Sequence, residues 1–166
     1  MPNNNSVLLV KDCSLESLQA LLSTYQLNLI IIENEKSIPG SYWGDSEAGL
    51  ISNKVYARQD TPIHSLLHES CHYICMDQSR RENLDTNAEG DYDEENGVCY
   101  LQILLSNNLP EMGQERMLQD MDSWGYTFRL GSSKKWFEDD AEDAFSWLLS
   151  HNIINKEKGV TYSLRH

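Results

Sequence analysis

The chain has 166 residues, a formal net charge of -13 at pH 7, and 40% hydrophobic and 23% charged residues. This length allows one domain with a real hydrophobic core and is too short for two ordinary domains. No apolar run approaches the length of a membrane span, which excludes membrane-spanning proteins. The negative charge makes nucleic acid and anionic membranes poor direct partners and favours a basic protein segment.

The N-terminal stretch MPNNNSVLLVKDCS has no basic region before its short apolar run. It therefore does not resemble a secretory signal, and we expect a cytoplasmic protein. The four cysteines contain no CxxC pair, and a chain of this size does not need disulfides to fold. We expect all four to be reduced thiols: Cys13, Cys71, Cys75 and Cys99.

The first third of the chain predicts a helix followed by two strands. Ser14 can cap a helix over roughly 15–25. Its buried stripe would contain Leu15, Leu18, Leu21 and Leu22. The β-branched run at 28–33 indicates a buried strand, and Pro39, Gly40 and Gly44 mark the loop after it. Alternation over 49–58 predicts a half-exposed strand.

The remainder of the chain is predominantly helical in its pattern. Asp60 or Thr61 followed by Pro62 predicts a helix start, and a polar link with little apolar surface covers 77–90. Further helices are expected over 91–107, 114–124 and 134–150, the last with its acidic residues on a solvated face. Lys158-Gly159, between two short apolar pieces, predicts a terminal hairpin.

The segment LLHESCHYIC, residues 66–75, places His68, Glu69 and His72 in the order His-Glu-x-x-His within an apolar, helix-compatible run. Residues four apart lie on one face of a helix, so the two imidazoles can bind one metal ion while Glu69 stands beside it as a base. The alternative is an ordinary, partly buried helix that carries two histidines one turn apart. The glutamate at the second position and the acidic helix downstream favour the metal site.

A hydrolytic zinc site normally has three protein ligands and one open position. The candidates for the third ligand are the acids at the start of the helix over 91–107: Asp91, Asp93, Glu94 and Glu95. Glu94 continues into the apolar stripe of Val98, Leu101 and Leu105, which must face the core and the first helix. Glu95 leads instead to a more polar strip of Cys99, Gln102 and Ser106. We therefore favour Glu94.

Gly97 supports this choice, because a missing side chain one turn after Glu94 would let the two helices approach closely. The alternative for Glu94 is a capping-box-like pair with Asp91, which would stabilise the helix start without chemistry. His64 stands eight residues before His72 and cannot share its metal, so it is expected in a supporting or surface position. Cys71 and Cys75 lie near the same stripe, where buried free thiols are favoured over a mixed zinc site.

With these residues, the chain resembles a zincin metallopeptidase of the gluzincin type, in which HExxH on one helix is completed by a glutamate on the next. More narrowly, it resembles the compact bacterial metallopeptidases of the IrrE/ImmA-like group. The order helix, strand, strand, HExxH helix and Glu helix over roughly 14–105 carries this likeness. The narrower group tends to have Ala-Asn where this chain has Gly97-Val98. The residue that supports the first histidine in gluzincins falls at Val98, which cannot accept a hydrogen bond, so either the support comes from elsewhere or activity is impaired.

The resemblance implies an α+β fold in which a short antiparallel or mixed sheet packs on the HExxH helix. It implies a single zincin-like domain over 1–166, with a core at about 14–110 and a helical extension at about 111–166. It also implies that His68, His72 and Glu94 bind zinc, which activates a water, and that Glu69 removes its proton.

The expected function is a zinc-dependent metallopeptidase that hydrolyses a peptide bond in a protein substrate. A donor to the oxyanion is expected among Tyr126, Arg129 and His151. The strand over 49–58 could pair with an extended substrate. The alternatives are a zincin-like interaction or regulatory module that does not cut, and a toxin or secreted effector.

Overall fold

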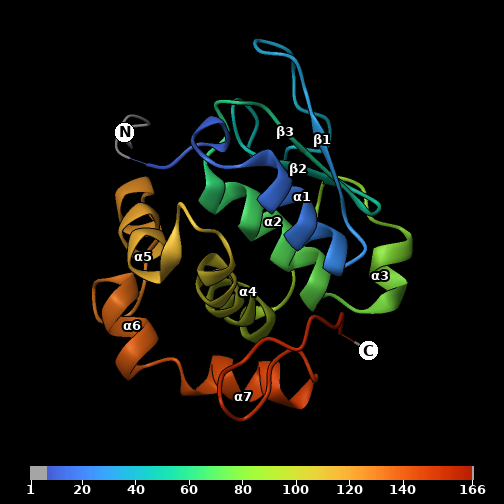
Figure 1. The fold of residues 1–166 in the computed structure, drawn as a ribbon. Coiled ribbons are helices and arrows are strands. Elements are labelled where there is room, and N and C mark those ends of the chain that lie inside the picture. The colour runs from blue at the N-terminus through green and yellow to red at the C-terminus, as the bar shows by residue number, and fades with distance from the viewer. Residues whose placement is uncertain (1–6, 166) are drawn as a thin grey trace.

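The computed structural model describes residues 7–165. Residues 1–6, part of the stretch judged not to be a secretory signal, lie outside the described residues. Within residues 7–165, no helix is long and apolar enough to cross a membrane. The chain is α+β, as expected (Figure 1). Its α-helices are α1 (Leu15–Thr24), α2 (Ile63–Cys75), α3 (Gln78–Glu82), α4 (Tyr92–Leu105), α5 (Gly113–Trp124), α6 (Ser133–Asp139) and α7 (Glu142–Ser150). Two short 3-10 helices are η2 (Val10–Asp12) and η3 (Ser106–Asn108).

The sheet is small and mixed. Its strands are β1 (Asn28–Ile31), β2 (Gly49–Ile51) and β3 (Lys54–Ala57), in the order β1-β3-β2. β3 pairs parallel to β1 and antiparallel to β2. The single strand predicted over 49–58 is wrong, because Ser52 and Asn53 form a tight turn in which Ser52 has a φ of 54°. The alternating pattern belongs to the two arms of a hairpin.

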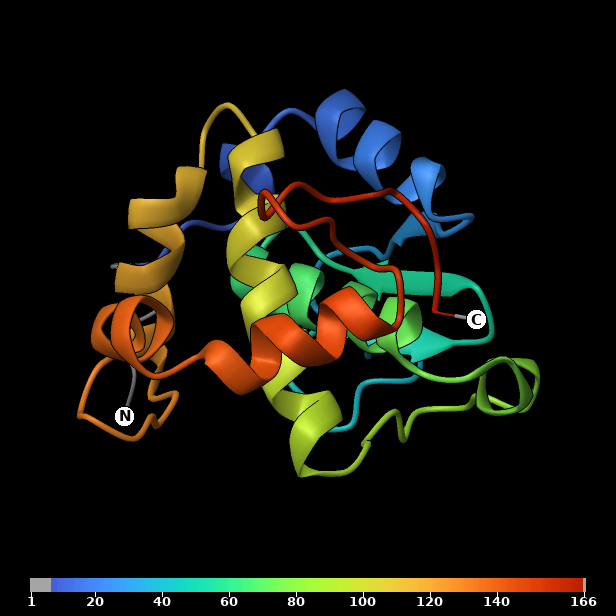
Figure 2. The same ribbon diagram turned by 90° about the horizontal axis from the view of Figure 1, so that it is seen from below.

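The metal-motif helix α2 lies at the centre of the molecule, between the sheet and α4 (Figure 1). Leu66, Leu67 and Cys71 are fully buried on it. On the other side of α4 lies α7, which crosses it in the view of Figure 2. One hydrophobic core contains residues of α1, the sheet and helices α2, α4, α5, α6 and α7.

The start of α1 is set by its own sequence. The Ser14 side chain accepts a hydrogen bond from the Ser17 amide, as the cap prediction requires. Leu18, Leu21 and Leu22 are buried, but Leu15 is 41% exposed. The predicted buried stripe is thus right except at Leu15, whose side chain in the first turn lies outside the core.

Two segments differ from their predicted structure. The polar link over 77–90 contains the short helix α3, whose Arg81 reaches back to the carbonyls of Tyr73 and Met76 at the end of α2. The single helix predicted over 134–150 is divided at Asp140, whose carboxylate binds Arg129 instead of continuing a solvated helical face.

Gly97 serves a different contact from the expected one. A Cβ built on Gly97 would lie 2.8 Å from the Trp147 ring of α7. The glycine therefore allows α4 to approach α7, and not α2. Near the C-terminus, Lys158 has a φ of 65°, and Ile154 and Val160 form an isolated antiparallel bridge. The predicted hairpin is reduced to this turn and bridge.

Candidate metal centre

His68 and His72 face each other on α2. Their Nε2 atoms are 3.1 Å apart, and their rings are nearly perpendicular, at 87°. Burial lowers the pKa of both imidazoles; for His68 the hydrogen bond that its Nδ1 donates to Gln102 opposes this, and for His72 the neighbouring His68 and Arg80 add to it. Both rings are therefore neutral at pH 7, which is the form that binds a metal ion.

Gln102 on α4 determines which nitrogen of His68 carries the proton. The Gln102 amide nitrogen donates to the carbonyl of His64 at 2.9 Å, which directs the Gln102 Oε1 atom at Nδ1 of His68, also at 2.9 Å. Nδ1 must then hold the hydrogen, and the lone pair of His68 lies on Nε2. The supporting acceptor that Val98 cannot supply is thus provided one helical turn further along α4.

The two Nε2 atoms must share a hydrogen or a metal ion. Because His68 presents a lone pair, the 3.1 Å contact is favourable only if His72 donates a hydrogen from Nε2 or a metal ion lies between the rings. Two nitrogens bound to one tetrahedral zinc at about 2.0 to 2.1 Å are about 3.3 Å apart. His72 Nδ1 is buried without a partner, as a bare acceptor if Nε2 carries the hydrogen and as an N–H if Nε2 binds a metal ion, so this atom does not decide between the two. The donor set fits a zinc ion.

Glu95 completes this group. Its Oε2 atom lies 3.6 Å from Nε2 of His72. Ligand atoms of His68, His72 and Glu95 all lie within 4.8 Å of one another, and among residues 7–165 they form the His/Cys/Asp/Glu group suited to a metal ion. The amide of Gly90 donates to the other carboxylate oxygen at 3.1 Å and holds Glu95 in place.

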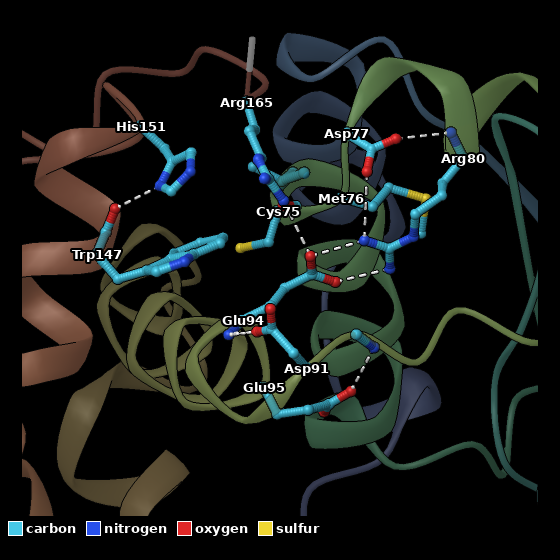
Figure 3. Close-up of polar contacts among 12 residues, drawn as sticks. Cys75, Met76, Asp77, Arg80, Asp91, Glu94, Glu95, Trp147, His151 and Arg165 are labelled. Carbon is cyan, nitrogen blue, oxygen red and sulfur yellow. Dashed lines mark hydrogen bonds and ion pairs between the residues drawn. The ribbon is translucent and has the colours of Figure 1, made fainter.

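Glu94, the residue favoured from the sequence, is engaged elsewhere (Figure 3). Arg80 binds both of its carboxylate oxygens, at 2.7 and 2.8 Å, and Arg165 binds Oε1 at 3.0 Å. Glu94 is buried, as its helical phase predicts, but its side chain points to this arginine pair near the C-terminal end of α2. The structure brings Glu95, and not Glu94, to the two histidines.

The other acids of this turn are not at the histidines. Asp91 caps α4 by accepting the Glu94 amide at 2.9 Å, and Asp93 is exposed. Of the capping-box-like pair considered for Asp91 and Glu94, only the hydrogen bond to the Asp91 side chain is present. The Glu94 side chain turns to the arginines and not back to the helix start. Cys71 and Cys75 are fully buried in the core, and burial raises their thiol pKa values, so they are packed as free thiols and not as ligands.

Glu69 stands next to the histidines and is only 7% exposed. Burial, followed by the charges of Glu47 and Glu95, raises its pKa to about 8. A carboxyl group with a raised pKa beside this pair of histidines is suited to accept and return a proton near neutral pH.

Two hollows meet at His68, Glu69 and Trp43. The smaller, of about 70 Å³, lies over the histidines and is also lined by Thr86, Ala88 and Glu89. The larger, of about 430 Å³, is lined by Glu47, Ser65, Trp124 and Tyr126 as well. Of the residues around these hollows, the sequence singles out the His68, Glu69 and His72 motif and Tyr126 as site residues. Trp43, Glu47 and Trp124 belong to no recognisable sequence motif.

Of the three candidate oxyanion donors, the fold places Tyr126 at the larger of the two hollows. Tyr126 lines the larger hollow, with its ring centroid 5.7 Å from that of His68. Arg129 pairs with Asp140, and His151 stacks on Trp147 at 4.2 Å, so neither lies at the hollows. His64 is fully buried, and its Nδ1 lies 3.2 Å from the Tyr126 hydroxyl, which makes it a supporting residue.

Comparisons with known proteins identify no relative. No protein-family model, no curated protein sequence and no solved structure matches the chain.

Proposed function

We propose that the protein is a zinc-dependent metallopeptidase with a zincin-like site of the gluzincin type. The observation that carries this proposal is the convergence of His68, His72 and Glu95 within 4.8 Å, beside the buried Glu69. The ligands come from one HExxH helix and from the first turn of the next long helix, as in the resemblance above, with Glu95 in place of Glu94.

His68, His72 and Glu95 would hold the zinc ion through Nε2, Nε2 and a carboxylate oxygen. When bound, zinc supplies a Lewis acid that polarises a peptide carbonyl and acidifies water. Gln102 keeps the lone pair of His68 on the ligand side. The buried surroundings strengthen the attraction between these ligands and a cation.

Glu69 is the general base in this proposal. It removes a proton from the attacking water and later gives that proton to the leaving amine. Its raised pKa matches this double role, since the group must both take up and release a proton. The smaller hollow, which Glu69 shares with both histidines, is the place where water and the scissile carbonyl would meet.

Tyr126 is the best placed donor to the oxyanion. His64 Nε2 is buried without a partner. Burying a bare acceptor is less costly than burying an unpaired N–H, so the proton of His64 belongs on Nδ1, where it donates to the Tyr126 oxygen. The Tyr126 hydroxyl hydrogen is then free to donate to substrate in the larger hollow.

The substrate backbone cannot pair with β3, because β3 is the central strand of the sheet. The outer side of β2 is also occupied, since Ser52 donates to the Leu84 carbonyl and Thr86 donates to the Leu50 carbonyl, both at 2.9 Å. The chain from Thr86 to Glu89 lines the hollow over the histidines. We therefore place the substrate along this segment and not along 49–58.

The test is proteolysis by the zinc-loaded protein. A diverse peptide mixture is incubated with the wild type and analysed by mass spectrometry, with Glu69→Gln as the variant and Glu16→Gln, on the exposed side of α1, as the matched control. Cleavage by the wild type and the control that falls about 10²- to 10⁴-fold in Glu69→Gln supports the proposal. Zinc binding without any turnover would instead identify a non-catalytic interaction module.

A further inference from the structure

The larger hollow beside Glu69 has a wall of aromatic rings. Trp43 and Trp124, together with Tyr126, line it next to His68 and Glu69. Trp43 is 72% exposed, which is unusual for so large an apolar side chain and leaves its ring available to a ligand. Its ring is packed edge-on against Tyr42 at 5.2 Å. A side chain that enters this hollow from a bound peptide would therefore contact indole and phenol rings.

A carboxylate is fixed within the same hollow. Trp124 Nε1 donates to Oε1 of Glu47 at 2.8 Å, and Ser65 Oγ donates to Oε2 at 2.5 Å. Ser65 is itself held by the Ala48 amide, which donates to its Oγ at 2.9 Å. Each carboxylate oxygen can accept two hydrogen bonds and accepts one here, so Glu47 keeps an acceptor site on each oxygen for a ligand.

The hollow contains no competing cation. Of the described residues, those that line it and the adjoining hollow over the histidines include no lysine and no arginine. Glu89 and Glu95 line the adjoining hollow, and the whole chain carries a net charge of -13. Aromatic faces and carboxylate oxygens together attract a cationic side chain, and the surrounding charge repels an acidic one.

We propose that this hollow is a specificity subsite for a lysine or arginine side chain adjacent to the scissile bond. The aliphatic stem would lie against Trp43 and Trp124, and the charged end would bind Glu47. Ser65 lies three residues before His68 and four before Glu69, so one face of α2 carries both the residue that holds Glu47 and the proposed general base. The inference rests on the proposed peptidase function and assigns it a basic peptide as substrate.

The first experiment measures kcat/KM of the zinc-loaded protein on peptides that differ at one position: Lys, Arg, norleucine, Phe or Glu. We expect Lys and Arg to be preferred. Glu47→Gln should lower the ratio of kcat/KM for these two peptides to kcat/KM for the norleucine peptide by about 10- to 100-fold, while Glu16→Gln leaves this ratio unchanged. Trp43→Ala, at an exposed position where folding is not at risk, should lower the same preference.

A second measurement separates this inference from the proposed function. n-Butylguanidinium and uncharged n-butylurea are titrated against the protein, with tryptophan fluorescence as the readout, without any need for turnover. Saturable guanidinium binding that is lost in Glu47→Gln supports the subsite even if no peptide is cut, in which case only the peptidase proposal fails. Cleavage with a preference for apolar residues, unchanged by Glu47→Gln, overturns the subsite and leaves the peptidase standing. Absence of both cleavage and guanidinium binding overturns both.

Discussion

The Oε1 atom of Gln102 lies 2.9 Å from Nδ1 of His68 and joins the two long central helices at the candidate metal centre. The same amide donates to the His64 carbonyl, so its orientation is fixed by a second contact on α2. A single buried glutamine thus determines both the tautomer and the ring orientation of a proposed zinc ligand.

Replacing this glutamine should weaken metal binding. Gln102→Leu removes the acceptor for Nδ1, so His68 can rotate or change tautomer, and zinc affinity should fall about 10- to 100-fold. Competition with a chromophoric chelator measures this affinity, and thermal unfolding followed by circular dichroism confirms that the variant is folded. Gln114→Leu, at a partly exposed position of α5, is the matched control. Unchanged affinity in folded Gln102→Leu would contradict the role given to Gln102.

Glu94 should contribute to stability and not to metal binding. Glu94→Gln removes the charge that pairs with Arg80 and Arg165, and we expect a loss of about 2 kcal/mol in the free energy of unfolding. Urea unfolding of the metal-free protein measures this loss. The partial exposure of Arg80 keeps the expected value below that of a fully buried pair. A loss of zinc affinity larger than the loss of stability would contradict this assignment.

Gly97 should not tolerate a side chain. Gly97→Ala places a Cβ 2.8 Å from the Trp147 ring, so the contact of α4 with α7 must open. We expect a destabilisation of about 1 to 3 kcal/mol, although alanine is the better helix former. In a double-mutant cycle, Trp147→Leu should relieve most of this cost. Equal costs in the two backgrounds would show that Trp147 is not the obstacle.

Acid should destabilise the metal-free protein through His64. Burial, with the neighbouring His68, lowers the pKa of His64 to about 3, against an ordinary value of 6.5. Between these values the unfolded chain binds a proton that the folded chain does not, so stability falls as the pH falls from about 6.5 to about 3. His64→Gln should reduce the slope of unfolding free energy by up to about 1.4 kcal/mol per pH unit. Urea unfolding in a chelator measures the slope, with His151→Gln as the control, and an unchanged slope in His64→Gln would contradict the assignment.

The elements that sequence predicts well are those whose signals are local. The Ser14 cap, the helix that carries His68 and His72, and α5 depend on residues within one or two turns of one another. The hairpin turn at Ser52 and the break at Asp140 are different, because each depends on a contact with another part of the chain. Asp140, for example, binds Arg129, which is 11 residues away.

The choice between Glu94 and Glu95 shows the same limit within the site. Helical phase correctly indicates that Glu94 is buried and that Glu95 shares a strip with Gln102. It does not show that Arg165, 71 residues away, binds Glu94. The polar strip is the side of α4 that meets the histidines, since Gln102 contacts both His64 and His68. Polar residues, and not the apolar stripe, therefore indicate the side of the candidate metal centre.

The most direct test of the account is a zinc titration of the wild type, Glu95→Gln and Glu94→Gln, each checked for folding by circular dichroism. We predict one zinc ion per wild-type chain, similar affinity in Glu94→Gln, and affinity at least about 10-fold weaker in Glu95→Gln. His72→Ala should abolish high-affinity binding. A folded wild-type chain without zinc affinity, or a site lost in Glu94→Gln and kept in Glu95→Gln, would contradict the assignment of His68, His72 and Glu95 as the metal centre.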